Sequence, residues 1–232
     1  MRRTVTGDYG RKVSVRLTSH SYNPIHEVCE YPLNDDMSRK ALLRRELLAA
    51  RRLLTSRDVT DAAELLASAA AALPELADAR TVAAYVSVGR EPGTHALLDG
   101  LRARGVRVLL PVLMADNDLD WAVYEGREHL LPAGRGLLEP HGAPLGPGAV
   151  LDADVVLLPG LAVDRRGMRL GRGGGSYDRV LARLAAAGAD PALVVLLYDD
   201  EVVTRVPEEP HDHPVHAVIT PTAVRRFLPR DV

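Results

Sequence analysis

Residues 157–178 combine clustered positive charge with clustered glycine, which suits phosphate binding. Five arginines lie in or beside this segment, namely Arg165, Arg166, Arg169, Arg172 and Arg179, among the glycines Gly171, Gly173, Gly174 and Gly175. Successive glycines let backbone N–H groups converge on phosphate oxygens, and the helix predicted at 178–187 adds the positive end of its dipole. The segment lacks the Gly-Lys-Ser/Thr ending of a Walker A motif and the spacing of a dinucleotide fingerprint. It therefore predicts an anion cradle, with a flexible surface turn as the alternative.

Two further pairs of charged residues are candidates for phosphate binding, one pair directly and the other through a metal ion. Lys40 and Arg44 stand four residues apart, so they share one face of a predicted helix, for which a solvated face is the alternative. Asp178 and Asp212 are candidate magnesium ligands, because Mg²⁺ takes few protein carboxylates and completes its shell with water and phosphate.

Glu91 and the run His211-Asp212-His213 are two more candidates for chemistry. Glu91 follows the end of a predicted strand, where a carboxylate that merely starts a helix is the alternative. The histidines are of metal-ligand type, but no Cys or further His lies at zinc spacing, so we do not expect a zinc site.

The elements that must position these residues alternate between strand and helix. Strands are expected at 81–86, 106–111, 154–158, 192–197 and 215–219, with an edge strand at 120–124. Helices are expected at 38–54, with Ser38 as the cap, and at 58–73, 94–104 and 178–187, whereas 125–150, rich in Gly and Pro, is interpreted as surface connection. The order predicts an α/β fold of three layers, α/β/α, with a mostly parallel central sheet. Its ligands should bind outside the carboxyl ends of the strands, where Glu91 and the glycine segment both fall.

The composition narrows the classes of function. The net charge of -2 at pH 7 gives no reason to expect affinity for nucleic acid or for membranes. The single cysteine, Cys29, excludes an intrachain disulfide framework and fits a reducing cytoplasm. No apolar run approaches membrane-spanning length, so a cytoplasmic protein is predicted.

Residues 1–36 differ from the rest of the chain. They hold three of the seven tyrosines and the only cysteine, and they show no sustained hydrophobic period. We expect a disordered N-terminal extension or an artefact of start-site choice with Met37 as the natural start, followed by a single domain at 37–232.

Taken in order, the motifs resemble those of the 5-formyltetrahydrofolate cyclo-ligase family, also called methenyltetrahydrofolate synthetase. The matching pieces are KALLR at 40–44, YVSVGREPGT at 85–94, Pro111, Glu139-Pro140, PGLAVD at 159–164, RLGRGGG at 169–175, Tyr177-Asp178 and His211-Asp212. The resemblance covers about 38–221, and its central block is the most specific part.

The resemblance implies an ATP-dependent ring closure. In that reaction 5-formyltetrahydrofolate becomes 5,10-methenyltetrahydrofolate, with ATP as co-substrate, Mg²⁺ as cofactor, and ADP and phosphate as products. The implied partners are these small molecules, with a monomer expected and a dimer left open.

Residue roles follow from the same resemblance. The family's ATP contacts fall at Lys40, Arg44, Arg169, Leu170, Gly171, Arg172, Gly173, Gly174, Gly175, Ser176 and Tyr177. Its folate contacts fall at Val86, Glu91, Arg172, Gly173, Gly174, Gly175 and Ser176, its catalytic positions at Lys40, Arg172 and Tyr177, and its magnesium ligands at Asp178 and Asp212.

One departure from the family pattern opens an alternative. The family usually has two aromatic residues before the aspartate, whereas Ser176 takes the first of these positions here. A protein that binds 5-formyltetrahydrofolate without converting it is therefore the second hypothesis. A sugar-phosphate enzyme on a related three-layer fold is disfavoured, because it leaves Lys40, Arg44 and Glu91 without a role.

Overall fold

The structure is a computed structural model that describes residues 36–209 and 212–227. The predictions made for 1–35 and for His211 lie outside the described residues. No helix in the described ranges is both long enough and apolar enough to cross a bilayer.

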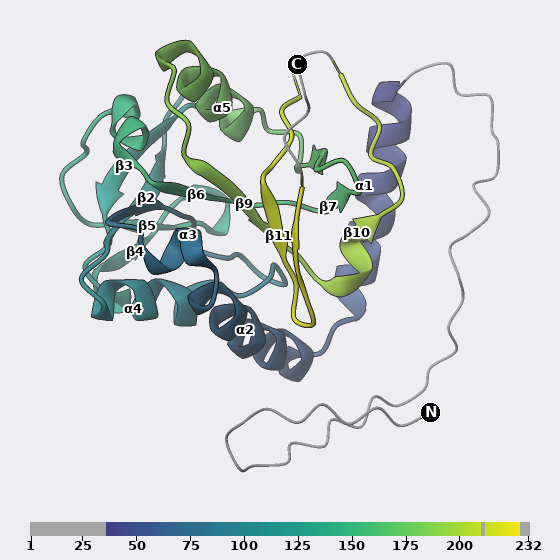
Figure 1. Cartoon of the computed structure of the whole chain (residues 1–232), viewed down its shortest axis with the longest axis horizontal. Helices are drawn as coiled ribbons and strands as arrows, with labels where there is room; N and C mark the ends of the chain where they lie inside the picture. The colour runs from purple at the N-terminus through teal and green to yellow at the C-terminus, as the bar shows by residue number, and fades with distance from the viewer. Residues whose placement is uncertain (1–35, 210–211, 228–232) are drawn as a thin grey trace. The chain divides into compact units, whose positions relative to one another are not determined.

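A seven-stranded sheet forms the centre of the described chain (Figure 1). Its strands, in spatial order, are β12 (Val224–Arg226), β11 (Ala217–Ile219), β9 (Ala192–Leu196), β6 (Val155–Leu158), β1 (Thr81–Ala83), β2 (Arg107–Leu113) and β3 (Leu119–Val123). The five strands from β11 to β2 run parallel, and the two edge strands β12 and β3 are antiparallel to their neighbours. The predicted mostly parallel sheet is confirmed, as is the edge strand near Trp121.

Helices cover both faces of this sheet, which confirms the three layers (Figure 1). One face carries α2 (Ser56–Ala71), α3 (Pro74–Ala77) and α4 (His95–Ala103), and the other carries α5 (Ser176–Ala187) and the 3₁₀ turn η3 (Pro147–Asp152). Strand β6 shows the reason, because its side chains alternate between the faces. Val155 and Leu157 pack toward α2 and α4, whereas Val156 and Leu158 pack toward α5, and all four are fully buried.

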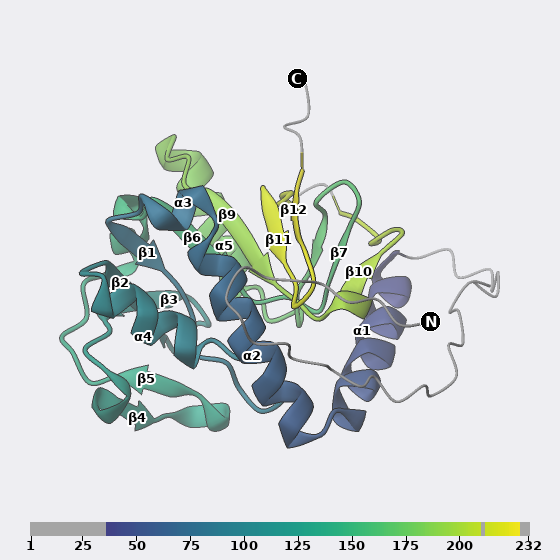
Figure 2. The ribbon, with the colours of Figure 1, turned by 60° about the horizontal axis from the view of Figure 1, so that its bottom comes forward.

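A small second sheet supports the first helix and was not predicted. It contains β10 (Val202–Val203), β7 (Ala162–Asp164) and β8 (Arg169–Leu170), and α1 (Asp36–Leu53) lies beside it (Figure 2). Leu43 and Leu47 of α1 pack against a buried cluster of Ala162, Met168, Leu170 and Val206. These strands of two or three residues are too short to produce a recognisable hydrophobic period.

Several helix boundaries differ from prediction by two residues. Helix α1 begins at Asp36, before the predicted cap Ser38. Helix α2 begins at Ser56, because Thr55 forms a capping box with Asp58. Helix α5 begins at Ser176, because Gly175, with φ 76°, reverses the chain there.

The prediction that 125–150 is only surface connection was wrong. The segment contains an antiparallel ribbon of β4 (Leu130–Pro132) and β5 (Leu138–Pro140). The ribbon was not predicted because Pro132 and Pro140 argue against a strand, since proline is tolerated only at strand edges and ends. The ribbon is fastened to the central sheet where the Leu113 N–H donates to Glu139 Oε1 at 3.0 Å.

A buried ion pair attaches α1 to the sheet. Arg51 donates through Nε and Nη2 to both oxygens of Glu201, at 2.6 and 2.8 Å, and both residues are 4% exposed. Arg51 Nη2 also donates to the carbonyl of Gly160, at 2.8 Å, just after β6. Burial raises the pKa of Glu201, and the Arg51 guanidinium opposes that rise.

We predict that Arg51→Met lowers the free energy of unfolding by about 3 kcal/mol at neutral pH, because it leaves a buried carboxylate without its cation. A carboxyl whose pKa is raised by folding costs stability above its unfolded pKa. The loss should therefore shrink as the pH falls through the folded-state pKa of Glu201. Denaturant unfolding at several pH values measures this.

The matched control is Arg52→Met, which removes the same charge from an exposed position one residue along α1. It should change the stability by less than about 0.5 kcal/mol. Equal stabilities of the two variants would contradict the role given to the Arg51–Glu201 pair.

Candidate active site at the glycine loop

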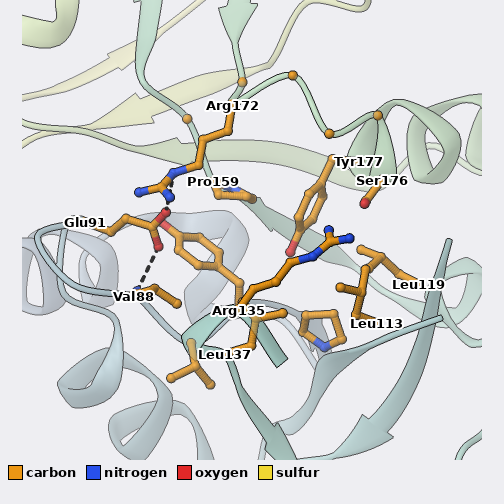
Figure 3. A pocket seen from close by; sticks show the side chains of 18 of the residues that line it. Val88, Glu91, Leu113, Leu119, Arg135, Leu137, Pro159, Arg172, Ser176 and Tyr177 are labelled. Atoms are coloured by element: carbon orange, nitrogen blue, oxygen red, sulfur yellow. Dashed lines mark hydrogen bonds and ion pairs between the residues drawn. The ribbon is translucent and has the colours of Figure 1, made fainter. Parts of the chain in front are cut away.

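A cavity of about 300 Å³ opens beside the glycine loop, which is residues 171–175. This volume lies within the range of small-molecule sites. Of the predicted site residues, Val86, Glu91, Arg169 and the whole run 171–178 line the cavity (Figure 3). The convergence of Glu91 with the glycine segment is as expected for residues that follow parallel strands of one sheet.

Four predicted site residues do not line this cavity: Lys40, Arg44, Leu170 and Asp212. The Leu170 side chain is 1% exposed and packs in the cluster beneath α1, so only its backbone is available to a ligand. The other three lie in or near the contact between α1 and the loop.

Arg44 contacts the glycine loop directly. Its Nε donates to the Gly171 carbonyl at 3.0 Å. Gly173 has φ 89°, and a Cβ there would lie 3.3 Å from Arg44 Cζ. Glycine at 173 therefore satisfies both the left-handed backbone and the close approach of the guanidinium.

The start of α5 faces the same cavity. Gly175 occupies the N-cap and provides no side-chain hydrogen bond to the first turn. The N–H groups of that turn therefore lack the side-chain acceptor that an Asp or Ser would supply. Ser176, Tyr177 and Asp178 all line the cavity at this helix end, which is a favourable place for an anion.

Lys40 lies between two carboxylates. Its Nζ donates to Glu209 Oε2 at 2.5 Å and to Asp212 Oδ2 at 2.6 Å, and the residue is 4% exposed. Burial lowers the pKa of Lys40, but the hydrogen bonds and charges of Asp212 and Glu209 outweigh burial and raise it. The ammonium is thus kept charged beside α1.

Arg169 interacts electrostatically with both predicted metal ligands, Asp178 and Asp212. Its Nη2 donates to Asp178 Oδ1 at 3.1 Å, and its Nη1 donates to the Pro159 carbonyl at 3.0 Å. Burial lowers the pKa of Arg169, and the charges of Asp178 and Asp212 are among those that oppose the change.

Glu91 is held from two directions. Its Oε1 pairs with Arg172 Nε at 3.2 Å, and its Oε2 accepts from the Val88 N–H at 2.9 Å (Figure 3). The loop that carries it is closed by reciprocal bonds, because Ser87 and Thr94 each accept the other's N–H with a hydroxyl. The result is a fixed carboxylate at one side of the cavity.

Tyr177 contributes a buried hydroxyl to the wall. Within the described part of the chain this hydroxyl has no hydrogen-bond partner, and burial raises the pKa of Tyr177. A protonated phenol without a partner in a cavity wall is a ready donor for a ligand.

Asp178 and Asp212 fit a magnesium site whose remaining ligands come from phosphate and water. They do not fit a site in which the protein supplies every ligand. The described residues contain no cluster of three or more Asp, Glu, His or Cys that could hold a metal. Asp178 nevertheless lies at the cavity and uses only Oδ1 for Arg169. Magnesium commonly takes one or two carboxylates together with substrate phosphates.

Sequence reasoning missed one wall of the cavity. Arg135, Leu137, Leu138 and Glu139 line it from the β4–β5 ribbon, and Figure 3 shows Leu137 across the cavity from Arg172. One sequence pattern could have predicted the ribbon. Leu130-Leu131-Pro132 and Leu138-Glu139-Pro140 are two short segments that each end in a proline, as strands often do.

Comparisons with known proteins agree with this arrangement. The model of the 5-formyltetrahydrofolate cyclo-ligase family matches residues 36–221. A Mycolicibacterium smegmatis protein named 5-formyltetrahydrofolate cyclo-ligase is 47% identical over 149 residues, covering 61% of this chain and 74% of that protein. An Escherichia coli K12 protein of the same name is 33% identical over 179 residues, covering 75% and 96%.

A solved structure shares the fold. The Aquifex aeolicus 5,10-methenyltetrahydrofolate synthetase superposes with a TM-score of 0.69 and 28% identity, covering 83% of this chain and 94% of that one. With the family match over most of the described chain, these similarities lead to one conclusion: the chain belongs to the 5-formyltetrahydrofolate cyclo-ligase family.

Proposed function

We propose that this protein catalyses the ATP-dependent cyclisation of 5-formyltetrahydrofolate to 5,10-methenyltetrahydrofolate in the cavity beside the glycine loop. The observation that carries the proposal is the composition of that cavity. A cationic glycine loop and a helix N-terminus line one part of it, and a fixed carboxylate, Glu91, lines another. A phosphate donor and a pterin can therefore meet in one space.

The reaction requires activation of a poor electrophile. The formyl oxygen takes the γ-phosphoryl group of ATP, and ADP leaves. Nitrogen-10 of the folate then attacks the activated formyl carbon, the C–O bond breaks, and phosphate departs with the former formyl oxygen while nitrogen-10 loses its proton. The protein's task is to position the two substrates and to stabilise the negative charge of the transferring group.

Lys40, Arg44 and Arg172 are the proposed phosphate contacts. Arg44 is supported by its contact with the glycine loop, and Lys40 by its place one turn earlier on α1. Arg172 is supported by its place in the loop and by a side chain that is 55% exposed at the cavity. A guanidinium so placed can donate charge-assisted hydrogen bonds to a phosphoryl group that lies between the two substrates.

Glu91 is proposed to bind the pterin, because the N–H groups of the pterin donate hydrogen bonds that a carboxylate accepts. Val86, the glycines of the loop and Ser176 complete the proposed folate contacts. The Tyr177 hydroxyl, buried without a partner, is proposed to donate to a substrate oxygen near the reacting centre.

Asp178 and Asp212 are the proposed holders of Mg²⁺, which would neutralise phosphate charge when bound. Asp178 is the better supported of the two, because it lies in the cavity wall. To bind the metal, Asp212 would first have to break its ion pair with Lys40.

The non-catalytic alternative is not favoured, because the relatives found are named as cyclo-ligases or synthetases. We further propose a single domain at 37–232 that acts as a monomer on small molecules in the cytoplasm. The cytoplasmic location is supported by the single cysteine.

Purified protein should form the methenyl product, followed by its near-ultraviolet absorbance, when 5-formyltetrahydrofolate, ATP and Mg²⁺ are all present. Omission of ATP or chelation of Mg²⁺ should abolish the signal. Absence of any ATP-dependent product from folded protein would refute the proposed function, and full activity after chelation would refute the magnesium requirement.

Arg172→Ala should reduce the turnover rate by roughly two to four orders of magnitude, because it removes a donor that stabilises phosphoryl charge. Arg165→Ala is the matched control, since Arg165 is an exposed arginine of the same cationic segment that does not line the cavity. Similar rates for the two variants would show that Arg172 does not act on the transferring group.

A further inference from the structure

We propose that Arg135 binds the glutamyl carboxylates of the folate substrate and so sets the preference of the enzyme for a glutamylated tail. The inference rests on the proposed function. It starts from an arginine that the sequence did not indicate, in the part of the cavity wall formed by the β4–β5 ribbon.

Arg135 lies at the closed end of the β4–β5 ribbon. The Ala133 N–H donates to the Leu137 carbonyl at 2.9 Å, and the Leu137 N–H returns to Gly134 at 3.2 Å, so the turn that carries Arg135 is closed by backbone bonds. Glu139 holds the same ribbon to the end of β2 through the Leu113 N–H. The arginine is therefore presented from a fixed element.

The backbone at Arg135 is in a costly conformation. Arg135 and Asn117, with φ of 61° and 65°, are the two non-glycine residues with positive φ among those that the structure describes. They are 18 residues apart and are joined by a hydrogen bond from Arg135 Nη1 to Asn117 Oδ1 at 3.1 Å. Left-handed backbone at non-glycine residues is concentrated at functional sites, where surrounding contacts enforce it.

Two arginines of α5 hold the residues on either side of Asn117. Arg179 donates to the Asp116 carbonyl at 2.6 Å, and Arg183 pairs with Asp118 at 2.6 Å, one residue on either side of Asn117. The Arg183 guanidinium also lowers the pKa of Asp118, so this pair stays ionised. Two arginines of the helix that begins at the glycine loop thus fix the partner of Arg135.

The charge of Arg135 is left for a ligand. Arg169 and Arg172, the other arginines that line the cavity, pair with Asp178 and Glu91. In the described ranges the one hydrogen-bond partner of Arg135 is the neutral amide of Asn117, and no carboxylate pairs with it. A guanidinium with free donors matches a carboxylate in two-point geometry.

The surroundings of Arg135 fit the tail of a folate. Figure 3 shows Arg135 on the other side of the cavity from Glu91 and Arg172, and the apolar residues Leu113 and Leu119 line the same cavity. With the pterin at Glu91, the aminobenzoyl ring would lie against apolar side chains, and the glutamyl carboxylates would follow it. Of the proposed phosphate contacts, Lys40 and Arg44 do not line this cavity, and Arg172 lines it on the side away from Arg135 (Figure 3).

The test compares two ligands that differ only in the tail, 5-formyltetrahydrofolate and 5-formyltetrahydropteroate, which lacks glutamate. In wild-type protein the glutamylated ligand should have the lower dissociation constant and the lower KM. Arg135→Gln should raise both constants for it about tenfold, the worth of one charge-assisted hydrogen bond, and leave kcat within about twofold. The same variant should leave the pteroate unaffected, and Arg135→Lys should restore part of the loss.

Arg57→Gln serves as the charge control, because its side chain is 88% exposed on α2 and does not line the cavity. Equal losses for both ligands, a change in the KM for ATP alone, or a wild type that does not distinguish the ligands would each overturn the inference. Calorimetric binding separates the two proposals: discrimination in binding without any methenyl product would refute the cyclo-ligase activity and keep the role of Arg135.

Discussion

The guanidinium of Arg51 joins three parts of the chain beneath the site. It belongs to α1, it pairs with the buried carboxylate of Glu201, and it binds the Gly160 carbonyl where β6 ends. Among the described side chains of α1, the partly buried Leu43 and Leu47 pack against the cluster beneath the helix, and the Arg51 ion pair adds a buried polar contact that fixes how the helix meets the sheet. Lys40 and Arg44 lie on the same helix, and their position against the glycine loop depends on it.

Three of the cations around the loop are paired with carboxylates. Lys40 pairs with Glu209 and Asp212, Arg169 with Asp178, and Arg172 with Glu91. This balance limits repulsion among like charges in a partly desolvated space. In the proposed mechanism the substrates would replace these internal pairs: phosphate would bind the cations, Asp178 and Asp212 would hold Mg²⁺, and Glu91 would accept hydrogen bonds from the pterin.

The sequence predicted the parts of the fold that have a local signal. Alternating strands and helices specified the parallel sheet, and parallel strands necessarily brought Glu91 and the glycine segment to one edge. The pairing of Lys40 with Asp212 could not be predicted, because 172 residues separate them and only the folded chain unites them. The Arg135–Asn117 contact was hidden for a different reason, since the ribbon that carries it has strands of three residues ending in proline.

The central claim is that the formyl oxygen itself accepts the phosphoryl group. The most direct measurement labels that oxygen of 5-formyltetrahydrofolate with oxygen-18 and examines the released phosphate by phosphorus NMR during turnover with unlabelled ATP in unlabelled water. The account predicts one labelled oxygen in each phosphate formed. Phosphate without the label, formed at the same rate as the methenyl product, would contradict it.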